Sequence, residues 1–113
     1  MDLEAKVDAI TLRLEDYRAL RYRPSVRVDA RVDVDTLVSL VIAAPVARRF
    51  DRAQPHYGTL PYRYWITFWF KDGTAHGVAY FHDTGWLSPG LRPGPTFRQF
   101  VEDRLPPPKR DAR

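Results

Sequence analysis

The side chains best suited to bind a partner or move a proton lie between Tyr62 and Asp83. Tryptophan, tyrosine and histidine rings alternate there with cationic side chains. Rings beside arginine are typical of protein interfaces. Rings beside cations of either kind are typical of surfaces that stack single-stranded nucleic-acid bases. The candidate binding residues are Arg63, Trp65, Trp69, His76, Tyr80 and His82, with Lys71 beside them.

Two strands joined by Asp72-Gly73 must position these residues. This dipeptide suits a two-residue type I′ turn, and it stands between aromatic and β-branched runs. The turn predicts that Trp69 pairs with His76, Trp65 with Tyr80, and Arg63 with His82. Alternation then places all six candidates on one face. The opposite face is predicted to be core and carries Tyr64, Ile66, Phe68 and Phe70 facing Ala75, Gly77, Ala79 and Phe81.

The three histidines are the first place to look for acid–base or metal chemistry. His76 and His82 share the predicted face, but six residues of strand separate them by about 20 Å, too far for one metal ion. Asp83 points away from His82, and His56 lies in a polar linker that could approach either histidine. No serine lies in a nucleophile elbow, and the glycines after residue 84 alternate with prolines. The sequence therefore favours a protein without enzymatic activity, metal or cofactor.

Length and composition predict one globular domain over residues 1–105, followed by a frayed, proline-rich basic tail over 106–113. The 113 residues contain no cysteine, so disulfides and thiolate chemistry are excluded. No apolar run approaches the roughly 20 residues of a membrane span. The N-terminus lacks the pattern of a signal peptide, so a cytoplasmic location is expected and no membrane partner is predicted.

Charge and composition say more about the host than about the function. The net charge of +4 is interspersed with acidic residues, which is typical of a solvated surface rather than a phosphate-binding track. Asparagine is absent, glutamine occurs twice and proline ten times, as in hot-adapted proteins. Fifteen arginines against three lysines fit a GC-rich genome. We take a thermophilic source as a hypothesis.

The first half of the chain predicts two strands and a helix. Residues 7–14 alternate as a half-buried strand, and 26–34 alternate completely, with valines and Ala30 on one side. Asp35 is predicted to cap a buried helix that Pro45 ends or kinks near Ala44. Residues 15–25 could extend the strand, form a helical turn or be a loop, and 51–61 form a polar linker.

The second half follows the hairpin with a loop and a helix. Residues 84–95 predict an irregular, ordered loop around Trp86 that packs over an edge of the sheet. Thr96 and Gln99 have the form of a capping box. An apolar stripe at helical spacing follows and ends before three prolines; its members are Phe97, Phe100, Val101 and Leu105.

The order strand-strand-helix-strand-strand-helix predicts an α+β domain: a four-stranded antiparallel sheet with both helices on one face. The other face would leave Trp65 and Trp69 to meet solvent, other parts of the chain, or a second copy. The leading hypothesis is a small interaction domain that binds a protein partner or forms a homo-oligomer through this aromatic face. The alternative is binding of single-stranded nucleic acid on the same face.

Overall fold

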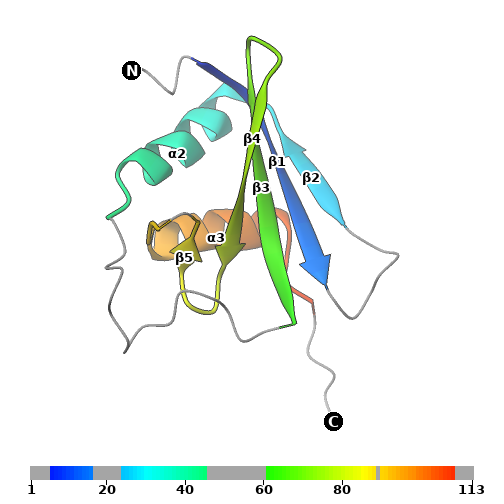
Figure 1. Ribbon diagram of the computed structural model, residues 1–113, viewed down its shortest axis with the longest axis vertical. Helices are drawn as coiled ribbons and strands as arrows, with labels where there is room; N and C mark the ends of the chain where they lie inside the picture. Colours follow the sequence, from blue (N-terminus) through cyan, green and yellow to red (C-terminus); the bar gives the residue numbers. More distant parts are fainter. Residues whose placement is uncertain (1–5, 17–23, 46–60, 89, 109–113) are drawn as a thin grey trace.

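A computed structural model describes residues 6–16, 24–45, 61–88 and 90–108. The described strands form one antiparallel sheet in the order β2-β1-β3-β4-β5. The predicted α+β class is confirmed, with one short strand more than the four expected (Figure 1). The elements are β1 (Val7–Asp16), β2 (Ser25–Val28), α2 (Arg31–Ile42), β3 (Tyr62–Phe70), β4 (Ala75–Phe81), β5 (Trp86–Leu87) and α3 (Pro95–Arg104).

One hydrophobic core lies between the sheet and the two described helices. On β1 and β3, alternate residues face this core in register, with Leu12 opposite Ile66 at its centre. The buried side chains of both helices belong to the same cluster, so α2 and α3 cover the same face of the sheet. The buried helix residues are Val34, Leu37, Val38, Phe97 and Val101.

The predicted register of the β3–β4 hairpin is wrong by one residue. Only Gly73 has a positive φ in the turn (91°), whereas a type I′ turn requires it at two residues. The Gly73 amide donates to the Phe70 carbonyl (3.0 Å), and the Phe70 amide donates to the Thr74 carbonyl (2.9 Å). The loop therefore has three residues, and Phe68 pairs with His76 instead of Gly77. A shift of one residue moves every β4 side chain to the opposite face.

The boundary between β2 and α2 also differs from the prediction. The strand ends at Val28 rather than Val34, and the helix begins at Arg31. Asp35 is not the N-cap: it lies inside the helix, where its Oδ1 accepts hydrogen bonds from Arg31 at 2.9 and 2.6 Å. The predicted stop is confirmed, because α2 ends at Ile42, shortly before Pro45.

The α3 helix keeps its predicted apolar stripe but not its predicted cap. Gly94, with φ of 88°, precedes the helix, and Pro95 occupies its first turn. Gln99 donates to Asp103 instead of closing a capping box with Thr96. Pro95 explains why the helix begins before Thr96. Its φ is fixed near the helical value, and the amide hydrogen that it lacks would have no partner in the first turn of a helix.

The segment predicted as an irregular loop contributes β5 to the sheet. Tyr80 pairs with Leu87 and Phe81 with Trp86, and Leu87 forms a further bridge to Leu91. Of the segment left open over 15–25, the first two residues extend β1, and 17–23 lie outside the described residues. Most of the predicted linker, with His56, and the end of the predicted tail lie outside them as well.

Candidate functional site

The register shift divides the six candidate residues between two faces of the sheet. Arg63, Trp65 and Trp69 alternate on β3 with the core residues Tyr64, Ile66 and Phe68, so they lie on the face without helices. On β4, His76 pairs with Phe68 and Tyr80 with Tyr64, so both lie on the helix side. His82 follows the strand and is buried against the Tyr64 ring on the same side. The prediction that all six share one face is wrong. On the helix-free face the tryptophans stand opposite Ala75 and Ala79.

Both tryptophan rings on the helix-free face are held against the sheet. The Trp69 indole donates its Nε1–H to the Thr11 hydroxyl on β1 (2.8 Å), and 40% of the residue remains exposed. Trp65 lies over Gly77 of β4, because an added Cβ there would come within 2.5 Å of the indole Cζ2. The Arg63 guanidinium lies over the Trp65 ring, 5.5 Å from its centroid. Gly77 is thus required by the close approach of an indole, a role that the sequence did not reveal.

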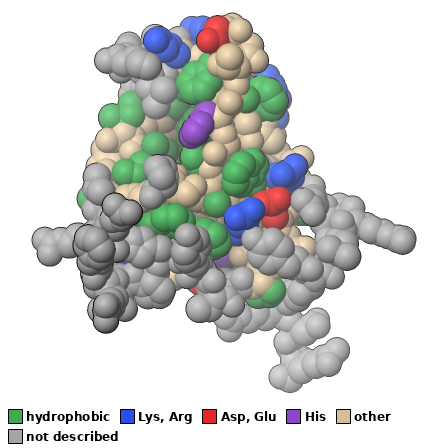
Figure 2. Space-filling view, viewed as in Figure 1, with side chains coloured by type: hydrophobic (Ala, Val, Ile, Leu, Met, Phe, Trp, Pro, Cys, Tyr) green, Lys and Arg blue, Asp and Glu red, His purple; other side chains and the backbone are tan. Residues whose placement is uncertain are grey.

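The Glu15 carboxylate forms ion pairs with two arginines at one end of this face. Glu15 accepts from Arg63 at 3.1 Å and from Arg13 at 3.2 Å, and its side chain is largely buried between them. On β2, at another part of the sheet, Arg27 forms an ion pair with Asp29, which follows the strand, at 3.6 Å. Figure 2 shows basic and acidic side chains in contact, with hydrophobic side chains spread between such groups. Among the described residues, three arginines of this face, Arg13, Arg27 and Arg63, are therefore paired with carboxylates of the same chain.

Two candidates, Tyr80 on β4 and His82 just after it, are buried on the helix side. Tyr80 is fully buried beneath α3, with its ring edge-on to Phe97 at 4.9 Å between centroids. Burial raises the pKa of Tyr80 to about 12. His82 is 5% exposed and stacks on Tyr62 with 5.1 Å between centroids. These positions leave neither side chain available to a partner on the helix-free face.

His76 remains exposed and borders a small apolar pocket. The pocket has a volume of about 190 Å³ and lies between the end of α2, the β3–β4 hairpin and the β5 region. Ser88 is its second polar residue. No sequence signal indicated its position, which follows from the pairing of β5. The apolar lining comprises Val41, Phe68, Phe70, Val78, Leu87 and Leu91.

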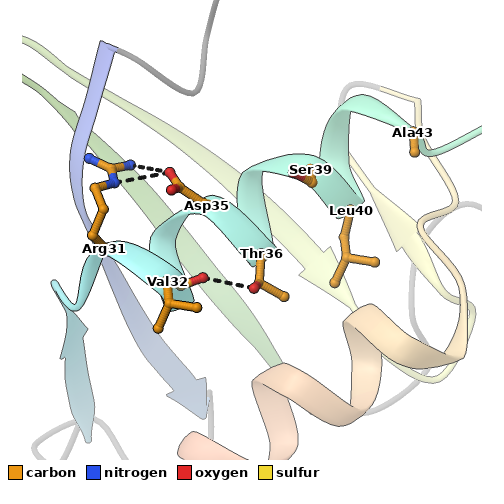
Figure 3. Close-up of a pocket in the computed structure, with 7 residues that line it drawn as sticks. All are labelled: Arg31, Val32, Asp35, Thr36, Ser39, Leu40 and Ala43. Atoms are coloured by element: carbon orange, nitrogen blue, oxygen red, sulfur yellow. Dashed lines mark hydrogen bonds and ion pairs between the residues drawn. The ribbon is translucent and has the colours of Figure 1, made fainter.

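A second depression runs along the outer side of α2 (Figure 3). Its charged residues satisfy each other, since Arg31 and Asp35 form an ion pair at 2.6 Å. The Thr36 hydroxyl donates to the Val32 carbonyl within the same helix (2.7 Å). These groups stabilise α2 locally and present no convergent set of donors to a ligand.

Within the described ranges, no group of three or more histidine, aspartate or glutamate side chains is arranged to hold a metal ion. Neither described helix has the length and apolar character needed to cross a membrane. No protein-family model, curated protein or solved structure matches this chain. Function is therefore inferred from the geometry of the two sheet faces.

Proposed function

We propose that this chain is a non-enzymatic interaction domain that self-associates through the helix-free face of its sheet. The observation that carries the proposal is the state of Trp69. The residue remains 40% exposed, and its large indole ring is held in one orientation by the bond to Thr11. A rigid exposed aromatic ring is characteristic of interface anchors, because little side-chain freedom is lost on binding.

The distribution of large and small residues on this face favours a second copy as the partner. Trp69 on β3 stands opposite the exposed Ala75 on β4. A protruding ring therefore lies beside a low surface on the same face. In a two-fold dimer each copy presents the same patch, so the ring of one copy can cover the low surface of the other.

The charge pattern of the face favours protein over nucleic acid. Binding to phosphates draws on cations that are free to replace counterions. Here Arg13 and Arg63 both bind Glu15, and Arg27 binds Asp29. A platform for single-stranded nucleic acid would lose these pairs as it gained phosphate contacts.

The area of the face sets the expected strength of association. Its three longer strands have ten, nine and seven residues. At about 3.3 Å per residue and about 4.8 Å between strands, they present roughly 400 Å² to a partner. Two copies would bury about 800 Å², below the range of stable complexes. We therefore expect a reversible dimer with a dissociation constant in the micromolar range or weaker.

Sedimentation velocity over a wide concentration range tests the proposal. The average mass should rise with concentration, and Trp69→Ala should abolish the rise while preserving the secondary structure seen by far-ultraviolet circular dichroism. Val32→Ala is the matched control, because Val32 is also a large exposed hydrophobic residue, 71% exposed, but lies on α2. A monomer at all concentrations, or equal loss of association in both variants, would contradict self-association.

The same protein distinguishes the nucleic-acid alternative. Quenching of tryptophan fluorescence by an oligothymidine, weakened by added salt, would favour that alternative over a dimer. We expect no quenching at low salt.

A further inference from the structure

We propose that the pocket beside His76 binds a small monocyclic aromatic molecule carrying one hydrogen-bond acceptor. The pocket lies on the helix side of the sheet, so its ligand would be separate from any partner on the helix-free face. Three features support the assignment: the walls are preformed, the two polar groups are suitably placed, and the volume fits one ring.

Backbone hydrogen bonds fix the walls of the pocket. Leu87 and Leu91 exchange two of them, each 2.8 Å long, which closes the turn that carries one wall. The next residue, Arg92, donates its amide to the Pro45 carbonyl just beyond α2 (2.9 Å), so this turn is tied to the end of the helix. A pocket held in this way loses little freedom when a ligand enters, which increases affinity.

The walls are apolar and incompletely covered. Val41, Phe70 and Leu91 all line the pocket and are only partly buried, although they pack against the main core. The exposed part of each side chain would gain contact with an apolar ligand. The ring of Phe68 is more deeply buried and completes the wall on the sheet side.

Ser88 provides an oriented hydrogen-bond donor. Its Oγ accepts the Ala79 amide (2.9 Å), and its own amide donates to the Ala79 carbonyl (2.9 Å). The bond from Ala79 uses a lone pair of Oγ and leaves the hydroxyl hydrogen available for donation. His76, exposed at the edge of the pocket, adds a ring nitrogen that bears hydrogen in either tautomer. A ligand with one acceptor atom would satisfy this polar side while its ring contacts the apolar walls.

The volume limits the size of the ligand. An apolar cavity of about 150 Å³ accommodates benzene, and most ligand pockets hold about 300–1,000 Å³. At about 190 Å³, this pocket fits one six-membered ring with one or two further heavy atoms. Bicyclic compounds and nucleotides are too large for it.

Nuclear magnetic resonance titration of the full chain with three probes tests the assignment. Benzyl alcohol has the proposed ring and acceptor, toluene lacks the acceptor, and 2-naphthalenemethanol has a second ring. We expect saturable shifts at His76, Val78 and Leu91 with benzyl alcohol, and about three- to tenfold weaker binding of toluene, the effect of one hydrogen bond. The bicyclic probe should not shift these residues.

Leu91→Trp should fill the pocket and abolish the benzyl alcohol shifts, since its side chain is part of the lining. Val32→Trp adds the same ring on the outer side of α2 and should leave them unchanged. Ser88→Ala should reduce the difference in affinity between benzyl alcohol and toluene, because only the His76 donor then remains at the pocket. Ser88→Thr should restore the difference. The proposal is overturned if benzyl alcohol does not saturate, if it binds the wild type no better than toluene, or if its shifts centre on Trp65 and Trp69.

Discussion

His82 shows how an aromatic cluster controls the charge of one imidazole. Its Nε2 is 3.1 Å from the Tyr62 hydroxyl oxygen, and the Tyr64 ring lies edge-on at 5.5 Å between centroids. Its Nδ1 is buried without a hydrogen-bond partner among the described residues. Burial lowers the pKa of His82, and Arg98 lowers it further, while Glu102 and Asp83 oppose the shift. The fold therefore favours the neutral ring.

This environment makes the free energy of unfolding depend on pH. The unfolded chain binds a proton on His82 near its ordinary pKa of 6.5, whereas the folded chain binds it only at lower pH. The pKa shift of His82 therefore costs no stability above about pH 7.5, where the ring is neutral in both states, and stability falls as the pH drops through 6.5 toward the folded pKa. Urea unfolding between pH 7.5 and 5 should show this fall in the wild type and a smaller one in His82→Phe. Equal slopes for the two proteins would contradict the assignment.

At the scale of elements, the passage from β2 to α2 shows what a local pattern leaves undecided. Val34 would be buried if the strand continued from Val28, as the alternation predicts. It is equally buried in the observed helix, which begins at Arg31. The Arg31 side chain favours the helix by donating to the Val7 carbonyl (2.8 Å) at the start of β1. Together with its bond to Asp35, this contact fixes the first turn of the helix beside the sheet.

Paired substitutions at Val32 and Val34 test this boundary. In the predicted strand both valines would share the buried face and contribute alike. In α2 they point in different directions, with Val34 fully buried and Val32 71% exposed. Val34→Ala should lower the free energy of unfolding by roughly 2 kcal/mol. Val32→Ala should change it by less than about 0.5 kcal/mol. Since both changes alter helix propensity equally, similar losses of stability by chemical denaturation would indicate a strand.

The features that the sequence predicted correctly are those set by local alternation. The sheet, the core residues of β1 and β3, and the α3 stripe all follow from which side chains are apolar. The hairpin register depended instead on a competition between two turns that both accept Asp-Gly. The Asp72 carboxylate favours the three-residue loop by accepting from the Thr74 amide and hydroxyl, at 2.9 and 2.6 Å. The three-residue loop therefore places Tyr80 and His82 in the core and separates them from Trp65 and Trp69.

At the scale of the whole molecule, the topology places the two proposed sites on opposite faces of one sheet. Consecutive β3 residues serve both, because Phe68 lines the pocket and Trp69 lies on the helix-free face. β1 lies inside the sheet and is bonded to β2 on one side and β3 on the other. The stability of both faces therefore depends on pairing β1 with a strand far away in the sequence.

This topology predicts slow folding for a small domain. Val7 pairs with Phe70, more than sixty residues later, and the whole β1–β3 ladder is non-local. Closing such a loop costs entropy before the pairing compensates for it, so the main refolding phase should last milliseconds to seconds. Stopped-flow tryptophan fluorescence measures it, and unfolding for about a second before refolding suppresses the slower proline phases of about 10–100 s. A refolding rate in water above about 10⁴ per second would contradict rate control by this ladder, since such speed is typical of domains built from local contacts.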